Sequence, residues 1–323
     1  MCTAIAGNER SRYFGRNLDI EYDLQRSLIS VPTGVKLRSR HQGEIERRCA
    51  FVGVGMIKDS FPLLFDGMNE YGIAVAALSF IGNAEYARFP TGSVNIASYE
   101  LIPYVLSTCK SMSDVSAFLD EVCITDDAFA PDMPPSDLHW MISDGEKSIV
   151  AESVSDGMRY YPNPVGVLTN NPSFPSQLQN LSYYMRLTPD EPENSFCQGV
   201  KIERNSYGLG AVGLPGDCSS QSRFVRCSFV KLNADMDTSP ELKISQLFHI
   251  LSSCEMTKGC VRIKERREYT HYSCVMDTEK RIYYLRTYGS GRICSFDLSR
   301  IKREESFITC TELPELPDIR ELN

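Results

Sequence analysis

Short runs of apolar residues separated by turn-forming segments recur along the chain, a pattern typical of a protein rich in β-structure. The first two runs, 2–6 and 12–17, flank the polar segment 7–11 and predict a β-hairpin. Further runs predict strands at 27–31, 50–56, 71–79, 138–143, 148–152, 158–161, 165–169, 271–276, 282–287 and 293–296. The long run 71–79 has the composition of a buried central strand.

Apolar residues also recur at helical spacing. The stretch after Ser239-Pro240 would place Leu242, Leu247 and Leu251 on an inward face. Other helices are expected near Leu101 and from Ser113, from Ser173, and from Ser219 or Ser220. Since no repeat or break in composition interrupts the chain, we expect a single domain over residues 1–323.

The composition narrows the class of protein. The chain has 323 residues, of which 42% are apolar and 24% charged, as in ordinary globular proteins. A net charge of −8 argues against nucleic acid or an anionic membrane as the main partner. No apolar run approaches the roughly 20 residues of a membrane span. The amino end also lacks the basic and apolar regions of a signal peptide, so we expect a cytoplasmic protein.

The cysteines and glycines of the chain do not indicate a metal or a cofactor. The twelve cysteines are scattered without a Cys-x-x-Cys pair, and we expect mostly buried free thiols rather than disulfides or zinc ligands. Residues 208–213 match the pattern of a dinucleotide-binding turn, but they lack the preceding strand and following helix that the pattern requires. We therefore predict neither metal nor cofactor.

The chemistry of the chain is concentrated at its second residue. If Met1 is removed, Cys2 carries a thiol and a free α-amine on one residue. An α-amine has an ordinary pKa of roughly 7.7 to 8.0, so it is a base suited to activating a neighbouring nucleophile near neutral pH. In an arbitrary protein a cysteine at the second position is accidental, and only further residues of a site would make it a nucleophile.

Arg16 and Asp19 are candidates for such residues. A hairpin loop of five residues would set Cys2 directly opposite Arg16, close enough for the guanidinium to stabilise a thiolate. Asp19 has the wrong parity for that face of a regular strand, so we expect it to reach the site from beyond the strand end and to hold the new amine. Taken alone, the two residues would also fit an ordinary solvated ion pair.

Several segments resemble the choloylglycine hydrolase family, which contains bile salt hydrolases and penicillin V acylases. They keep their order and cover nearly the whole chain: Cys2, Phe14-Gly15-Arg16-Asn17-Leu18-Asp19-Ile20-Glu21-Tyr22, Asp66-Gly67-Met68-Asn69-Glu70, Leu138-His139-Trp140-Met141-Ile142-Ser143-Asp144, Leu168-Thr169-Asn170-Asn171-Pro172, and Gly213-Leu214-Pro215-Gly216-Asp217 with Ser222-Arg223. The resemblance implies an α+β fold, namely a four-layer αββα sandwich in which two antiparallel sheets are flanked by helices. It also implies the chemistry of an N-terminal-nucleophile amidase.

The resemblance also implies roles for individual residues. Cys2 would be the nucleophile, with its own amine as the base and Arg16 and Asp19 beside it. Asn170 would donate a hydrogen bond to the oxyanion, and Arg223 would complete the charged cluster. The family is often tetrameric, so a homotetramer is expected.

One position departs from the family pattern. Ser79 stands where bile salt hydrolases usually have Asn and penicillin V acylases Tyr. The backbone N–H of Ser79 can still donate to an oxyanion, whereas the choice of substrate is affected. The leading expectation is hydrolysis of glycine- or taurine-conjugated bile acids, a reaction of lipid metabolism; penicillin V hydrolysis and, in another class, a non-catalytic carrier of amphipathic acids are the alternatives.

Three apolar residues, Leu18, Phe129 and Met133, are candidates for binding the acyl group. Leu18 lies within the first motif, beside Asp19. The segment 126–137 is rich in Pro, Asp and Met and is expected to be a long loop, with Phe129 and Met133 as apolar residues within it. These side chains either line a pocket for a bulky acyl group or fasten a surface loop to the body.

Overall fold

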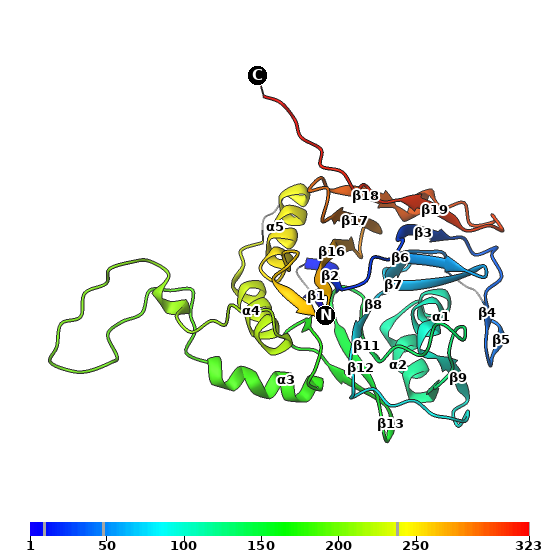
Figure 1. Cartoon of the computed structure of the whole chain (residues 1–323), viewed down its shortest axis with the longest axis horizontal. Helices are drawn as coiled ribbons and strands as arrows, with labels where there is room; N and C mark the ends of the chain where they lie inside the picture. The colour runs from blue at the N-terminus through cyan, green and yellow to red at the C-terminus, as the bar shows by residue number, and fades with distance from the viewer. Residues whose placement is uncertain (9–10, 47–48, 237–238, 323) are drawn as a thin grey trace.

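The computed structural model describes residues 1–8, 11–46, 49–236 and 239–322. Two large antiparallel sheets lie face to face, with helices covering the outer face of each (Figure 1). This arrangement confirms the predicted α+β, four-layer αββα architecture.

The first sheet contains the amino-terminal strand in its interior. Its strands lie in the order β14 (Val167–Leu168), β1 (Cys2–Asn8), β2 (Ser11–Ile20), β16 (Arg266–Asp277), β17 (Ile282–Thr287) and β18 (Cys294–Asp297), and β15 (Val261–Ile263) pairs with β16. Because β1 is flanked on both sides and covered on both faces, its residues Cys2 to Ala6 are all buried.

The second sheet is built mainly from consecutive hairpins. Its order is β13 (Gly157–Pro162), β12 (Ser148–Val154), β11 (Leu138–Ser143), β8 (Ala74–Ser79), β7 (Phe61–Asn69), β6 (Phe51–Lys58), β3 (Ser27–Val31) and β19 (Thr309–Glu312). Two small sheets complete the strands: β9 (Val94–Ala97) with β10 (Val122–Thr125), and β4 (Arg38–Ser39) with β5 (Gly43–Glu44).

The helices form the outer layers. Helices α1 (Leu101–Thr108) and α2 (Met112–Glu121) cover the second sheet, whereas α4 (Ser220–Asn233) and α5 (Pro240–Ser252) cover the first, with α3 (Phe174–Asn180) beside α4. Short 3-10 helices lie at Ser98–Glu100, Leu181–Tyr184, Leu209–Ala211 and Leu298–Arg300. One apolar core fills the space between the sheets and beneath α4 and α5, and another lies beneath α1 and α2.

Most predicted strands are present, with two notable differences. Strand β7 was not predicted, and the strand expected at 71–79 begins only at Ala74. The side chain of Asn69 explains the late start, since its Oδ1 accepts hydrogen bonds from the backbone N–H groups of Tyr71 and Ile73 at 3.0 and 3.1 Å and closes a turn. Gly72 within that turn has φ +86°, a conformation that favours glycine.

The helices and cysteines also correct some expectations. The N-cap of α2 is Ser111 rather than Ser113, because Ser111 and Asp114 form a reciprocal capping box. Leu242 is 55% exposed, so it does not point inward as predicted. All twelve cysteines are free as expected, but only five of the other eleven are buried, so most are not.

A long segment, 185–219, projects from the body between the end of α3 and the start of α4 (Figure 1). Several of its large apolar side chains face solvent, among them Phe196 at 88% and Tyr207 at 92% exposure. The carboxyl-terminal residues also extend away from the body, whereas the amino end lies at its centre, in the first sheet.

Candidate active site

Cys2 is the first residue of β1 and is only 4% exposed. Its partner across the hairpin is Leu18, so the predicted pairing with Arg16 is wrong; Arg16 lies opposite Ala4. The predicted turn fell partly on residues 9–10, which lie outside the described residues, and the register shifts between Ala6 and Asn8. Because the error is two residues and side chains alternate with a period of two, Arg16 remains on the face of the sheet that Cys2 occupies.

Arg16 lies buried between the two sheets and contacts the thiol directly. Its Nη2 donates to Cys2 Sγ at 2.7 Å, and its Nη1 donates to the carbonyl oxygens of Phe65 at 2.7 Å and Ala77 at 3.1 Å. Burial alone would lower the pKa of Arg16, but the acidic groups of Cys2, Tyr272 and Asp66 raise it above its usual range. The guanidinium therefore stays charged and can stabilise a thiolate.

Asp19 lies within β2, and the expectation that it reaches the site from beyond the strand end is wrong. It lies directly opposite Thr270, whose hydroxyl donates to Asp19 Oδ1 at 2.5 Å. A register shift between Thr270 and Tyr272 makes this pairing possible. Among the described residues Asp19 Oδ2 has no partner. Burial raises the pKa of Asp19, and Arg223 and the terminal ammonium partly offset that rise.

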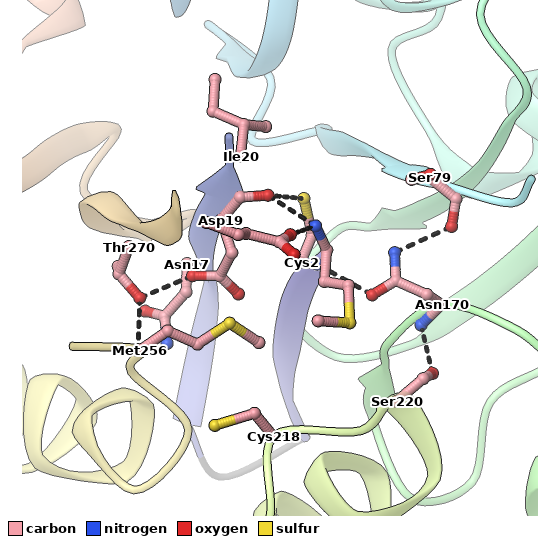
Figure 2. A network of polar contacts seen from close by, with 12 residues as sticks. Cys2, Asn17, Asp19, Ile20, Ser79, Asn170, Cys218, Ser220, Met256 and Thr270 are labelled. Atoms are coloured by element: carbon pink, nitrogen blue, oxygen red, sulfur yellow. Dashed lines mark hydrogen bonds and ion pairs between the residues drawn. The ribbon is translucent and has the colours of Figure 1, made fainter. Parts of the chain in front are cut away.

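Asn170 follows β14 and joins three elements of the site (Figure 2). Its Oδ1 accepts from the backbone N–H of Cys2 at 2.8 Å, and its Nδ2 donates to the carbonyl oxygen of Ser79 at 2.8 Å. Its own backbone N–H donates to Ser220 Oγ at 2.8 Å. An amide nitrogen carries two hydrogens, so the second hydrogen on Nδ2 can serve an oxyanion. The described contact of Ser79 is through its carbonyl group, at the end of β8.

Arg223 reaches the same residues from the first turn of α4, where the structure confirms Ser219 as the N-cap. Its Nη2 donates to Asn170 Oδ1 at 2.7 Å, and its Nη1 donates to the carbonyl oxygen of Cys2 and to Thr3 Oγ1. The side chain is fully buried. It thus fixes both the backbone of the nucleophile and the orientation of Asn170.

The terminal amine in this structure belongs to Met1. It donates to the carbonyl oxygen of Asp19 at 2.7 Å and forms an ion pair with the carboxylate of Glu268. Cys2 Sγ lies 4.0 Å from the same Asp19 oxygen. Burial lowers the pKa of this amine, while the acidic groups of Cys2 and Asp19 oppose the change. The terminal amine thus lies close to both the Asp19 carbonyl oxygen and the Cys2 thiol.

The predicted acyl-binding residues lie in two places. Leu18 faces the nucleophile across the hairpin and is 2% exposed. Phe129 packs edge-on against Tyr99, with ring centroids 5.1 Å apart, and its backbone N–H donates to the carbonyl of Met133. The Met133 sulfur lies 3.2 Å from Lys58 Nζ. These contacts hold the loop to the body, and they do not by themselves join Phe129 or Met133 to Cys2.

Several residues of the site were not singled out from the sequence. Asp66, within a motif quoted above, accepts hydrogen bonds from the hydroxyls of Tyr272 and Tyr283 and lies 3.8 Å from Arg16 Nη1. Glu268 follows a basic segment that resembles a solvated turn, and one charged residue at a strand start gives no signal of burial. Asp66 is itself part of a motif that carries the family resemblance, and this membership is the signal that could have drawn attention to it.

Within residues 1–8, 11–46, 49–236 and 239–322, no cluster of three or more His, Cys, Asp or Glu side chains could hold a metal ion. In that same part of the chain no helix is both long and apolar enough to cross a bilayer.

The geometry describes a class of enzyme. The buried thiol of Cys2 contacts the guanidinium of Arg16 and lies at the start of an interior strand. The side-chain amide of Asn170, which can donate to an oxyanion, is hydrogen-bonded to the backbone of the same cysteine. Two stacked antiparallel sheets between helices, with the nucleophile at the start of a central strand, are the N-terminal-nucleophile hydrolase fold. Such an enzyme breaks linear amide bonds.

The chain belongs to the choloylglycine hydrolase family of linear amide C–N hydrolases, whose model matches residues 2–311. It is 41% identical to a bile salt hydrolase/transferase of Lactiplantibacillus plantarum over 300 residues, which cover 93% of each chain. A crystal structure of the C2A mutant of conjugated bile acid hydrolase from Clostridium perfringens matches with a TM-score of 0.91, 32% identity and full coverage of both chains. Penicillin V acylase from Agrobacterium tumefaciens shares the fold, with a TM-score of 0.76 at 17% identity over 98% of this chain and 92% of that one.

Proposed function

We propose that this enzyme hydrolyses the amide bond of glycine- or taurine-conjugated bile acids through an acyl-enzyme on Cys2. The observation that carries the proposal is the 2.7 Å contact between Arg16 Nη2 and Cys2 Sγ. Cys2 is the first residue of its strand, and its backbone N–H donates a hydrogen bond to Asn170. The relatives named for bile salts, which align over nearly the whole chain, support the choice of substrate.

The proposed reaction begins after Met1 has been removed. The amine of Cys2 takes the thiol proton, and the thiolate, stabilised by Arg16, attacks the amide carbonyl and forms a C–S bond. Asn170 Nδ2 and the backbone N–H of Ser79 stabilise the oxyanion. The C–N bond then breaks as the α-ammonium gives its proton to the leaving amine.

Water completes the cycle. The free α-amine accepts a proton from water as the water oxygen attacks the thioester carbonyl. The C–S bond then breaks to release the bile acid, and the α-ammonium returns its proton to the Cys2 thiolate. Asp19 holds the amine, and Arg223 keeps Asn170 and the Cys2 carbonyl in place. No step requires a cofactor.

Replacing the nucleophile tests this mechanism. We expect Cys2→Ala to lower kcat by at least about 1,000-fold while the protein still folds, because no other group can form the thioester. Release of glycine or taurine from a conjugated bile acid measures the effect. Cys260→Ala, which removes an exposed thiol, is the matched control and should keep full activity. Residual activity of Cys2→Ala within about tenfold of wild type would rule the mechanism out.

A comparison of substrates tests the specificity. We expect kcat/KM to be higher for a conjugated bile acid than for phenoxymethylpenicillin, the substrate of the alternative that Ser79 leaves open. A non-catalytic carrier would bind either compound stoichiometrically without releasing amine. Intact mass adds an independent criterion, since the proposed enzyme must have lost Met1.

We also propose that Leu18, Phe129 and Met133 contribute to the acyl-binding surface. Leu18 is the direct neighbour of the nucleophile across the hairpin. Phe129 extends a half-buried aromatic cluster that includes Phe61 and Tyr99, and a steroid acyl group requires apolar surface of this kind.

Finally, we propose a single-domain, cytoplasmic enzyme that assembles as a homotetramer. Free cysteines are typical of reducing compartments, and both sheets, whose strands come from both ends of the chain, share one core. The projecting segment exposes large apolar side chains that subunit contacts would cover: Met185, Phe196, Val200, Tyr207 and Val212. Light scattering measures the assembled mass.

A further inference from the structure

Glu268 is a buried carboxylate that no step of the proposed reaction uses. It lies near the start of β16, opposite Val261 of β15, and its side chain is fully buried. Among the described residues neither of its oxygens accepts a hydrogen bond; its contact is the ion pair with the ammonium of Met1. A buried carboxylate needs a counter-ion, so this pair accounts for its presence in the core.

The residue that supplies this counter-ion is the one that must leave. Removal of Met1 takes away an ammonium held by Glu268 and by the carbonyl oxygen of Asp19. It also turns the backbone nitrogen of Cys2, which now donates to Asn170 Oδ1, into a new ammonium one residue along the chain. The mature protein therefore has an ammonium-binding position and, next to it, one new ammonium.

Other charged and titratable groups surround this position. They come from β1, from β2 and the residue after it, and from α4: the thiol of Cys2, Arg16, Asp19, Glu21 and Arg223. Within the described part of the chain, Asp19 Oδ2 has no hydrogen-bond partner, but Asp19 is also close to Arg223, whereas the ion pair of Glu268 is with the amine. Of the described acids Asp19 and Glu268, Glu268 is thus the one that is paired with the terminal amine alone.

We propose that Glu268 is a positioning residue of the mature enzyme, and that its carboxylate, together with the Asp19 carbonyl oxygen, holds the α-ammonium of Cys2. This inference rests on the proposed function, because it requires that Met1 be removed and that the Cys2 amine carry the proton. Held by Asn170 on one side and by Glu268 on the other, the amine has a fixed orientation for passing its proton to the leaving group.

The arrangement has a predictable effect on titration. Burial disfavours the charged form of an amine, as it does for Met1, and a neighbouring carboxylate favours that form. Without the carboxylate, the ammonium should lose its proton at lower pH. The ammonium is needed to protonate the leaving amine. The alkaline limb of the pH–activity profile should therefore shift to lower pH.

Replacing Glu268→Gln in the full-length, processed enzyme tests the proposal. We expect the alkaline limb of kcat/KM to move down by about one pH unit, and the titration of the Cys2 amine, followed by its 15N chemical shift in cysteine-labelled protein, to move equally. Glu265→Gln, an exposed carboxylate in the same β15–β16 hairpin, is the matched control and should leave both unchanged. Glu268→Asp keeps the charge and should move both by less than half as much.

The outcomes separate this inference from the proposed function. An unshifted amine titration in processed, active Glu268→Gln enzyme overturns the role of Glu268 and leaves the Cys2 mechanism standing. An active wild-type enzyme that retains Met1 overturns both. A merely structural role would lower activity at every pH without moving the titration. If Glu268→Gln does not fold, Glu268→Met places a neutral, unbranched side chain in the same space and provides the same comparison.

Discussion

Two aspartates near Arg16 have similar burial and different surroundings. Asp66 and Asp19 are both fully buried. Each oxygen of Asp66 accepts a hydrogen bond from a tyrosine hydroxyl, Tyr272 on one and Tyr283 on the other, and Arg16 lies 3.8 Å away. Asp19 has a single side-chain donor, Thr270, and within the described residues its second oxygen has no partner.

We propose that the difference separates a structural carboxylate, Asp66, from a functional one, Asp19. A buried polar group with all its partners present contributes to the stability and uniqueness of the core, whereas an incompletely partnered group is unfavourable and persists where a reaction requires it. Asp66 thus holds Arg16 and ties the two sheets together through the tyrosines. Asp19 keeps an oxygen available beside the terminal amine.

The largest effect that we expect is a loss of catalytic activity when Asp19 is replaced. We expect Asp19→Ala to lower kcat/KM by roughly 100-fold or more, because the amine loses a group that orients it for proton transfer. Turnover of a conjugated bile acid measures the change. A kcat/KM within about threefold of wild type would show that Asp19 is not required.

The second largest effect is a difference in stability between variants of Asp66 and Asp19. Asp66→Ala should lower the free energy of unfolding by about 3–5 kcal/mol, because two buried hydroxyls and a buried guanidinium lose their acceptor. Asp19→Ala should lower it by only about 1 kcal/mol, since Thr270 alone loses an acceptor. Urea unfolding at neutral pH measures both values. Equal losses in the two variants would contradict the comparison.

The smallest effect concerns the pH dependence of stability. Burial raises the pKa of Asp19 in the folded protein above its usual 3.8, so its neutral form contributes stability below pH 3.8 that is lost as the pH rises through the folded pKa. Asp19→Asn keeps a neutral side chain at every pH. We therefore expect its stability relative to wild type to increase as the pH rises from below 3.8 towards neutrality. Urea midpoints at several pH values measure this trend, and a relative stability that decreases with pH would contradict it.

Local patterns predicted much of the fold. The structure matches the predicted strands at 27–31, 138–143 and 282–287 and the predicted start of α5 at Pro240. In each of these segments a regular pattern of apolar residues is bounded by turn-forming or capping residues. Strand β7 was missed, although it carries Asp66. Its buried sequence contains Asp, Gly and Asn, which disfavour strands, and the tyrosines that make Asp66 acceptable come from residues more than 200 positions away.

The site was predicted less completely than the fold. The proximity of Arg16 to Cys2 followed from strand parity even though the register was wrong by two residues. The position of Asp19 depends on a register shift in β16 that no local pattern indicates. Family resemblance, rather than residue pattern, brought Asn170 and Arg223 into the site, since their contacts with Cys2 span more than 160 positions.

The interior position of β1 has a practical consequence for handling the protein. Any affinity tag fused ahead of Cys2 would have to leave the molecule through the space that Met1 fills, against Asp19 and Glu268. A tag at the opposite end would follow exposed residues that extend away from the body (Figure 1). Purification handles therefore belong at the carboxyl terminus.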